Sequence, residues 1–94
     1  MNDTELFLLE NILDSLDRLF DRDSYAIDVY ALVFATAKAL AETKHFEILD
    51  KTAESLAAIL KTIHSKDELR DAALLETDKL RHYIAELLPP FVNN

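Results

Sequence analysis

The residues of this chain that come closest to a metal site are Glu42 and His45, in the sequence Glu42-Thr43-Lys44-His45. This E-x-x-H spacing puts a carboxylate and an imidazole on one side of a helix, as in two-metal sites inside helical bundles. Such a site needs a second E-x-x-H pair and two further glutamates, and the sequence does not repeat the pattern. The motif also falls at a predicted helix boundary. We therefore expect no metal here.

Two E-x-x-D pairs, Glu47 with Asp50 and Glu68 with Asp71, resemble the acidic motifs with which all-α nucleotide pyrophosphohydrolases hold magnesium. Both pairs stand near the starts of predicted helices that should run antiparallel, so they would lie on the order of 20 Å apart. Magnesium needs its carboxylate ligands within one coordination sphere. Each pair is better explained as favourable negative charge at a helix N-terminus.

The other reactive side chains show no arrangement that is typical of catalysis. His45, His64 and His82 stand far apart in the sequence, and serine, threonine and lysine residues lack a matching base or oxyanion loop. The chain has no cysteine and no glycine, which excludes thiolate sites and glycine-rich phosphate loops. We expect a protein that is not an enzyme and that has no cofactor.

Hydrophobic spacing predicts an all-α fold, an antiparallel four-helix bundle that forms a single domain over residues 1–94. The predicted helices cover about 3–20, 24–42, 45–63 and 66–88. Residues with capping side chains stand before each helix, and a pair of prolines follows the last one. These signals are Asn2 or Asp3, Asp23 or Ser24, Thr43, Ser65, and Pro89-Pro90.

The predicted helix 24–42 is apolar on almost every side, so we expect it to be the central and most buried helix. Ala31, Ala35 and Ala39 would let its neighbours approach closely. In the predicted helix 66–88, the stretch 74–77 departs from the apolar stripe. A kink near Thr77 would explain the departure, and so would a second apolar face that a partner or the segment 91–92 covers.

The acidic residues of the chain are concentrated near its start. The formal net charge is −8, and residues 1–28 hold eight acids against two bases. Acids recur at helical spacing along one side of the first predicted helix, at Asp3, Glu10, Asp14, Asp17 and Asp21. This stripe fits two interpretations, a solvated face that aids solubility or a docking surface for a cationic partner.

The charge and the first residues also bear on partners and location. A strongly acidic surface repels nucleic acid and anionic membranes and attracts basic proteins, so we expect no nucleic acid and no membrane as partner. The start of the chain, MNDTELFLLEN, lacks the basic flank and the cleavage site of a signal peptide. We therefore expect a cytoplasmic protein.

The junction of the first two predicted helices, LDSLDRLFDRDSYAIDVYALVFATAKAL, resembles a family of inhibitors. It is similar to the acidic helical immunity proteins that accompany colicins and contact-dependent growth-inhibition toxins, in length, charge sign, helix count and acids beside tyrosines. The chain departs from the DNase-colicin branch, because Tyr25 and Tyr30 lie in a long helix rather than side by side in a short one. The resemblance implies a cytoplasmic protein that binds one toxin and blocks its nucleic-acid site.

We therefore predict an immunity protein or antitoxin that neutralises a basic, nuclease-type toxin through an acidic surface. Acids would steer the partner and a tyrosine would anchor it. The predicted contact residues are Glu10, Asp14, Asp17, Asp21, Asp23, Tyr25, Asp28 and Tyr30. The alternative is a structural or adaptor module that self-associates as a homodimer, through exposed leucines such as Leu8, Leu32 and Leu74.

Overall fold

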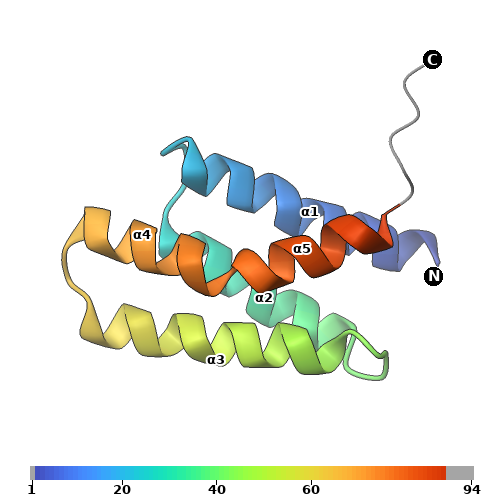
Figure 1. Cartoon of the computed structure of the whole chain (residues 1–94). Helices are drawn as coiled ribbons and strands as arrows, with labels where there is room; N and C mark the ends of the chain where they lie inside the picture. Colours follow the sequence, from blue (N-terminus) through green and yellow to red (C-terminus); the bar gives the residue numbers. More distant parts are fainter. Residues whose placement is uncertain (1, 89–94) are drawn as a thin grey trace, which may run out of the picture.

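The computed structural model describes residues 2–88, and these residues form five α-helices and no strand. Figure 1 shows their order, with α4 and α5 end to end along one side of the molecule. The helices are α1 (Asp3–Phe20), α2 (Ala26–Ala39), α3 (Phe46–Thr62), α4 (Lys66–Glu76) and α5 (Asp78–Leu87). The predicted all-α fold is confirmed. The stop at Pro89-Pro90 and the segment 91–92 lie outside the described residues.

The helix predicted over 66–88 is interrupted, so the described chain has five helices instead of four. The interruption is at Thr77, which ends α4 and precedes α5. Its buried hydroxyl donates a hydrogen bond to the carbonyl of Ala73 at 2.8 Å. Thr52 makes the same kind of bond to Ile48 inside the unbroken α3, so this bond accompanies the break but does not by itself cause it. The break at Thr77 is the reason that the apolar stripe shifts in this segment.

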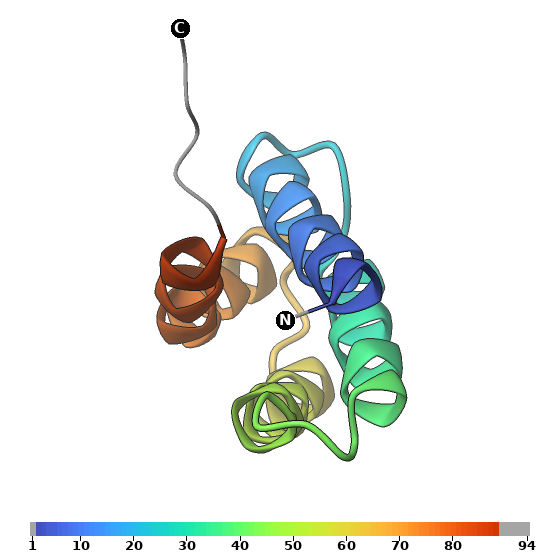
Figure 2. The same ribbon diagram turned by 90° about the vertical axis from the view of Figure 1, so that its right-hand side faces the viewer.

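One cluster of buried apolar side chains lies between the helices. Seen end-on in Figure 2, α1, α2, α3 and the α4–α5 pair surround this interior. Residues three and four apart on each helix supply the cluster, as amphipathic helices require. Its members are Leu9, Ile12, Leu16, Leu19, Ala26, Val29, Val33, Ala37, Leu40, Leu49, Ala53, Leu56, Ala73, Leu80 and Ile84.

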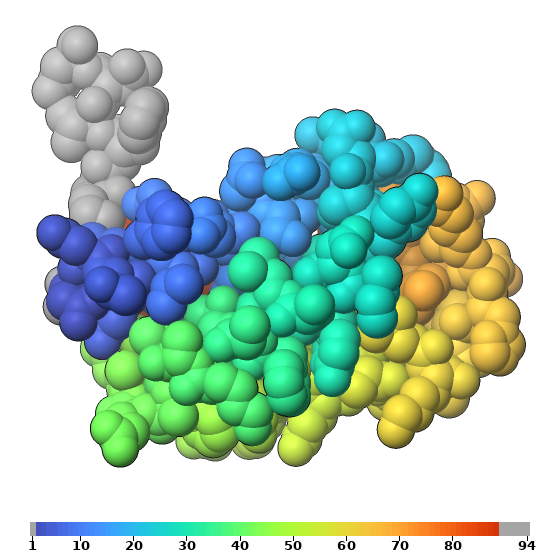
Figure 3. Space-filling model, turned by 180° about the vertical axis from the view of Figure 1, so that it is seen from behind, coloured from blue at the N-terminus to red at the C-terminus, as the bar shows by residue number. Residues whose placement is uncertain are grey.

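The prediction that the second helix is buried on all sides is wrong. Ile27 is 53% exposed, Phe34 is 43% exposed, and Ala31 and Ala35 are also exposed. Figure 3 shows α2 on the surface of the molecule, beside α1. In this arrangement every helix has neighbours on its inner side only, so an apolar outer face stays uncovered. Helix α2 also ends at Ala39, before the predicted boundary at 42.

Two of the predicted helix caps are confirmed. The Asn2 side chain accepts a hydrogen bond from the backbone amide of Glu5 at 2.8 Å, and Ser65 accepts one from the amide of Glu68 at 3.5 Å. The cap of α2 is Tyr25 instead of Asp23 or Ser24.

The start of α3 also differs from its prediction. Thr43 is not its cap, since α3 begins after His45. The Thr43 hydroxyl nevertheless supports this turn, because it accepts a hydrogen bond from the backbone amide of His45 at 3.2 Å.

The chain leaves α1 through a tight turn centred on Arg22. The amide of Asp23 donates to the carbonyl of Arg18 at 2.7 Å, and the amide of Arg22 donates to that of Leu19 at 3.2 Å. This is the Schellman pattern, in which glycine usually takes the left-handed position. Here Arg22 takes it, with φ of 65°. For a residue with a Cβ atom this conformation costs about 1 kcal/mol.

Candidate protein-binding surface

Four of the predicted contact residues lie on one exposed side of α1 and its C-terminal cap. We call this set, Glu10, Asp14, Asp17 and Asp21, the acidic face. Asp14 pairs with Arg18 at 3.5 Å, and both side chains are exposed, so this pair contributes only about 0.3–0.5 kcal/mol. Within residues 2–88 the other three carboxylates make no ion pair. The acidic face therefore keeps most of its negative charge.

An aromatic side chain that the sequence analysis missed lies next to the acidic face. Phe7 is 63% exposed and stands three residues before Glu10, one turn along the same side of α1. Large exposed aromatic side chains are common anchors of protein interfaces. Phe7 could have been identified from the sequence, because it precedes Glu10 and Asp14 at helical spacing. It also lies outside the apolar stripe of this helix.

The other predicted contact residues lie in the turn before α2 or on α2. Asp23 is exposed in that turn. Asp28 is also exposed, and its carboxylate accepts a hydrogen bond from the backbone amide of Tyr25 at 3.2 Å. This bond caps the start of α2, so Asp28 has a structural role as well as a surface charge.

The two tyrosines have different surroundings. Tyr25 is 56% exposed, and the ammonium group of Lys66 lies 4.6 Å from the centre of its ring. Tyr30 is half-buried against the core, with its ring centre 5.9 Å from that of Phe34. Tyr25 therefore lies against the first turn of α4, and Tyr30 contributes partly to packing. The role of either residue as an anchor stays a prediction.

The outer side of α2 carries a second exposed surface, which is apolar. We call Ile27, Ala31, Phe34 and Ala35 the apolar face. A lysine borders it, since the Lys38 ammonium lies 5.1 Å from the centre of the Phe34 ring. Figure 3 shows that α1 and α2 both contribute to this side of the molecule.

The leucines predicted to mediate self-association are not suited to it. Leu8, Leu32 and Leu74 are partly buried and pack against the core. The expectation that these side chains are exposed is therefore wrong, because each lies at the edge of a helix contact. If the chain self-associates, the apolar face of α2 offers the better surface.

The arrangement nearest to catalytic chemistry is a buried contact between His45 and Tyr83. The Nδ1 atom of His45 lies 2.7 Å from the Tyr83 hydroxyl, and Nε2 lies 3.9 Å from the carboxylate of Glu5. Burial raises the pKa of Tyr83 above its ordinary value, so the hydroxyl keeps its proton and can donate it to Nδ1. His45 is 1% exposed, so its imidazole has almost no contact with solvent. The contact instead ties together the elements α1, α3 and α5.

Neither a metal site nor a membrane-spanning helix emerges from the described part of the chain. Across residues 2–88 no three histidine, aspartate or glutamate side chains gather closely enough to hold a metal ion. None of the helices formed by these residues combines the length and the apolar content that crossing a membrane requires.

Comparisons with protein-family models, with curated protein sequences and with solved structures gave no match. The resemblance to immunity proteins therefore rests on length, charge and helix pattern. The site must be interpreted from its own geometry, which is an acidic face with an exposed phenylalanine beside an apolar face on the neighbouring helix.

Proposed function

We propose that this protein is an inhibitor of the immunity or antitoxin type, which binds a basic, nuclease-type toxin domain in the cytoplasm. The acidic face of α1 makes the contact, with Phe7 as its aromatic anchor. The observation that supports this most is the combination of three unpaired carboxylates, Glu10, Asp17 and Asp21, with Phe7 on one side of a helix. In this proposal α4 and α5 act as one arm of an antiparallel four-helix bundle, without enzymatic activity or cofactor.

The two kinds of side chain have separate roles in such a complex. Carboxylates that face a basic nuclease surface accelerate the encounter, because opposite charges attract over about one Debye length. An aromatic side chain that becomes desolvated in the complex mainly slows dissociation. The inhibitor then covers the positive surface on which the nuclease would bind its nucleic acid.

The buried side of α1 favours binding through the acidic face, because its packing orders the helix before a partner binds. Leu9, Ile12, Leu16 and Leu19 are buried in the core along its length. A contact surface on a helix that is already ordered loses little conformational freedom on association. Tight binding then needs fewer contacts than a flexible segment would need.

The test first asks whether a gene next to that of this chain encodes a basic nuclease domain, and then co-expresses that domain with the chain. Cells should survive with the natural chain and die with the variant that combines Asp14→Lys, Asp17→Lys and Asp21→Lys. The matched control combines Glu54→Lys, Glu76→Lys and Glu86→Lys, which changes the net charge equally at exposed sites outside α1. The proposal would be wrong if both variants protected the cells equally well, or if both lost protection to the same extent.

A second function, a self-associating adaptor, is favoured by the apolar face of α2. In an antiparallel pairing of two copies centred on Val33, Ala31 of one copy would face Ala35 of the other. Lys38 would lie at the level of Asp28, so opposite charges would match. Sedimentation velocity tests this pairing: a dimer that Phe34→Glu dissociates supports it, and a monomer at all concentrations excludes it.

A further inference from the structure

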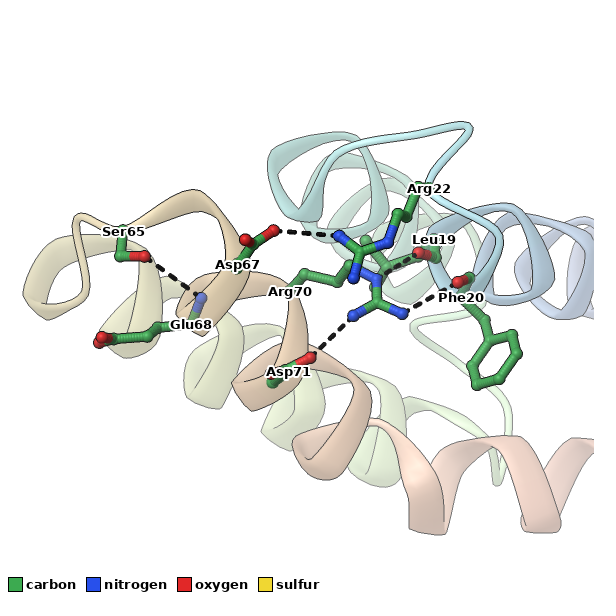
Figure 4. Close-up of polar contacts among 8 residues, drawn as sticks. All are labelled: Leu19, Phe20, Arg22, Ser65, Asp67, Glu68, Arg70 and Asp71. Atoms are coloured by element: carbon green, nitrogen blue, oxygen red, sulfur yellow. Dashed lines mark hydrogen bonds and ion pairs between the residues drawn. The ribbon is translucent and has the colours of Figure 1, made fainter.

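A hollow of about 340 Å³ lies where the turn between α1 and α2 meets the first turns of α4. Its charged lining residues come from two segments that are distant in the sequence, and most of them appear in Figure 4. We call it the cationic hollow, because its charged lining consists of Arg22, Lys66 and Arg70 against Asp67 alone. Its apolar walls are Leu19, Ala26, Ile27 and Leu69, with Tyr25 and Ser24 beside them.

The positive charge of the hollow is unusual in a chain with a net charge of −8. Arg70 is held firmly, since Nε donates to the carbonyl of Leu19 at 3.2 Å and Nη2 donates to that of Phe20 at 3.0 Å. Its Nη1 also pairs with the carboxylate of Asp71 at 2.8 Å, so Lys66 carries the excess positive charge of the hollow. Arg22 is held weakly, because its ion pair with Asp67 at 3.0 Å joins two exposed side chains. Figure 4 shows both contacts between the end of α1 and the start of α4. Arg22 can therefore exchange its partner for a ligand.

Two helix N-termini also contribute to the hollow. Tyr25 caps α2, whose first residues are Ala26 and Ile27, and Lys66 is the first residue of α4. The helix dipole places positive potential at both starts, and the carboxylates of Asp28, Asp67 and Glu68 in these first turns offset part of it. A lysine at this position opposes the dipole, so the stability of α4 does not account for it.

One polar atom beside the hollow has no hydrogen-bond partner. The hydroxyl oxygen of Ser24, which lines the hollow, is buried and has no hydrogen-bond partner within residues 2–88. An unpaired buried hydroxyl costs about 1–3 kcal/mol. The oxygen is shielded from solvent in this conformation, so a ligand in the hollow reaches it only when the Ser24 side chain rotates to another rotamer.

We propose that the cationic hollow binds a small organic anion. Its carboxylate or phosphate group contacts Lys66 and Arg22, and its apolar part lies on Leu19, Ile27 and the ring of Tyr25. Rotation of the Ser24 side chain lets the Ser24 hydroxyl donate to the same charged group. The volume falls at the lower end of the range of about 300–1,000 Å³ for ligand pockets, which suits a compact molecule. This site does not depend on the proposed inhibitor function, since it shares no residue with the acidic face.

Phenyl phosphate is a suitable probe, because it combines a dianion with an apolar ring. In a nuclear magnetic resonance titration of the full chain, the amides of residues 24–27 and 66–70 should shift saturably, with a Kd below about 1 mM. Inorganic phosphate and benzyl alcohol should each bind at least about tenfold more weakly, because each lacks half of the recognised chemistry.

Variants test whether the hollow itself is the site. Lys66→Gln should weaken phenyl phosphate binding about tenfold, through loss of a charge-assisted contact. Ser24→Ala should weaken it about threefold without any change of charge. The matched control is Lys51→Gln on α3, an exposed lysine paired with Glu47, which should leave the affinity unchanged. Equal affinities in Lys66→Gln and Lys51→Gln would overturn the proposal, as would equal binding of inorganic phosphate or benzyl alcohol.

Discussion

The outer faces of α1 and α2 lie on the same side of the molecule and differ in chemistry. On α1 the buried stripe is apolar and the outer side carries the acidic face, so water solvates the exposed charges. On α2 both sides are apolar, and Ile27 and Phe34 remain in contact with water. Exposed charge is ordinary on a soluble surface, whereas a continuous exposed apolar face more often marks a contact. Each face therefore needs its own test, because only α1 has charge to steer a partner.

The largest expected effect is a difference in stability between variants on the two sides of α1. Leu16→Ala removes a side chain that is 2% exposed and should lower the free energy of unfolding by about 2–5 kcal/mol. Phe7→Ala, on the outer side, should change it by no more than about 0.5 kcal/mol. Urea denaturation measures both. A large loss from Phe7→Ala would mean that this ring serves packing, and its role as an anchor would then be wrong.

The next largest effect is a difference in association rate between variants on α1 and on α2. Reversal of Asp14, Asp17 and Asp21 to lysine should slow association with a basic nuclease domain by about two orders of magnitude at low salt. Phe34→Glu on α2 should leave the association rate nearly unchanged. Stopped-flow fluorescence at two salt concentrations provides the measurement. If the α2 variant were the slower of the two, the contact would belong to the apolar face.

A smaller effect should appear where α1 is fixed to the other helices. Tyr83→Phe leaves Nδ1 of the buried His45 without its partner and should cost about 1–2 kcal/mol of stability. The matched control is Tyr30→Phe, because the Tyr30 hydroxyl makes no hydrogen bond within residues 2–88. Its cost should stay below about 0.5 kcal/mol. Equal costs in urea denaturation would show that the His45 contact adds no stability.

Tyr83 also gives stability a pH dependence, because burial desolvates its hydroxyl. Its pKa is raised in the folded chain relative to the ordinary value of 10.0, so the folded state holds the proton more tightly than the unfolded state does. This contribution is present below pH 10.0 and is lost as the pH rises through the folded pKa. Tyr83→Phe should remove it, and unchanged alkaline unfolding curves would contradict the assignment.

The smallest effect concerns the turn that joins the two helices. Arg22→Gly should stabilise the fold by about 0.5 kcal/mol, since relief of the left-handed conformation outweighs the added freedom of the unfolded chain. Arg18→Gly, inside α1, should instead destabilise it by about 1 kcal/mol. Thermal unfolding of both variants checks the opposite signs. A loss of stability in Arg22→Gly would show that the ion pair with Asp67 stabilises the fold by more than the left-handed conformation of Arg22 costs.

The parts of the fold that were predictable depend on local patterns. Helix α1 and helix α3 have one apolar side and clear starts, so their bounds were predicted within about one residue. The break at Thr77 could be predicted, because the apolar stripe shifts in the sequence at that point. The exposure of α2 could not be predicted. Burial depends on which helices lie next to α2, and an apolar sequence does not specify its neighbours.

The candidate site was predictable only in part, for the same reason. The acids of α1 follow a helical repeat that can be read from the sequence. The contact between His45 and Tyr83 joins residues 38 positions apart, and no local pattern marks it. The cationic hollow likewise appears only when the turn at Arg22 and the start of α4 are brought together.

The hydrogen bonds of Arg70 have a consequence for the order in which the structure opens. Its side chain, on α4, holds the last carbonyl groups of α1. Fraying of that end of α1 therefore requires release of the α4 side chain as well. In native-state hydrogen exchange, the amides at the end of α1 and those at the start of α4 should become accessible in one cooperative opening. Two segments 50 residues apart would then behave as one unit of local unfolding.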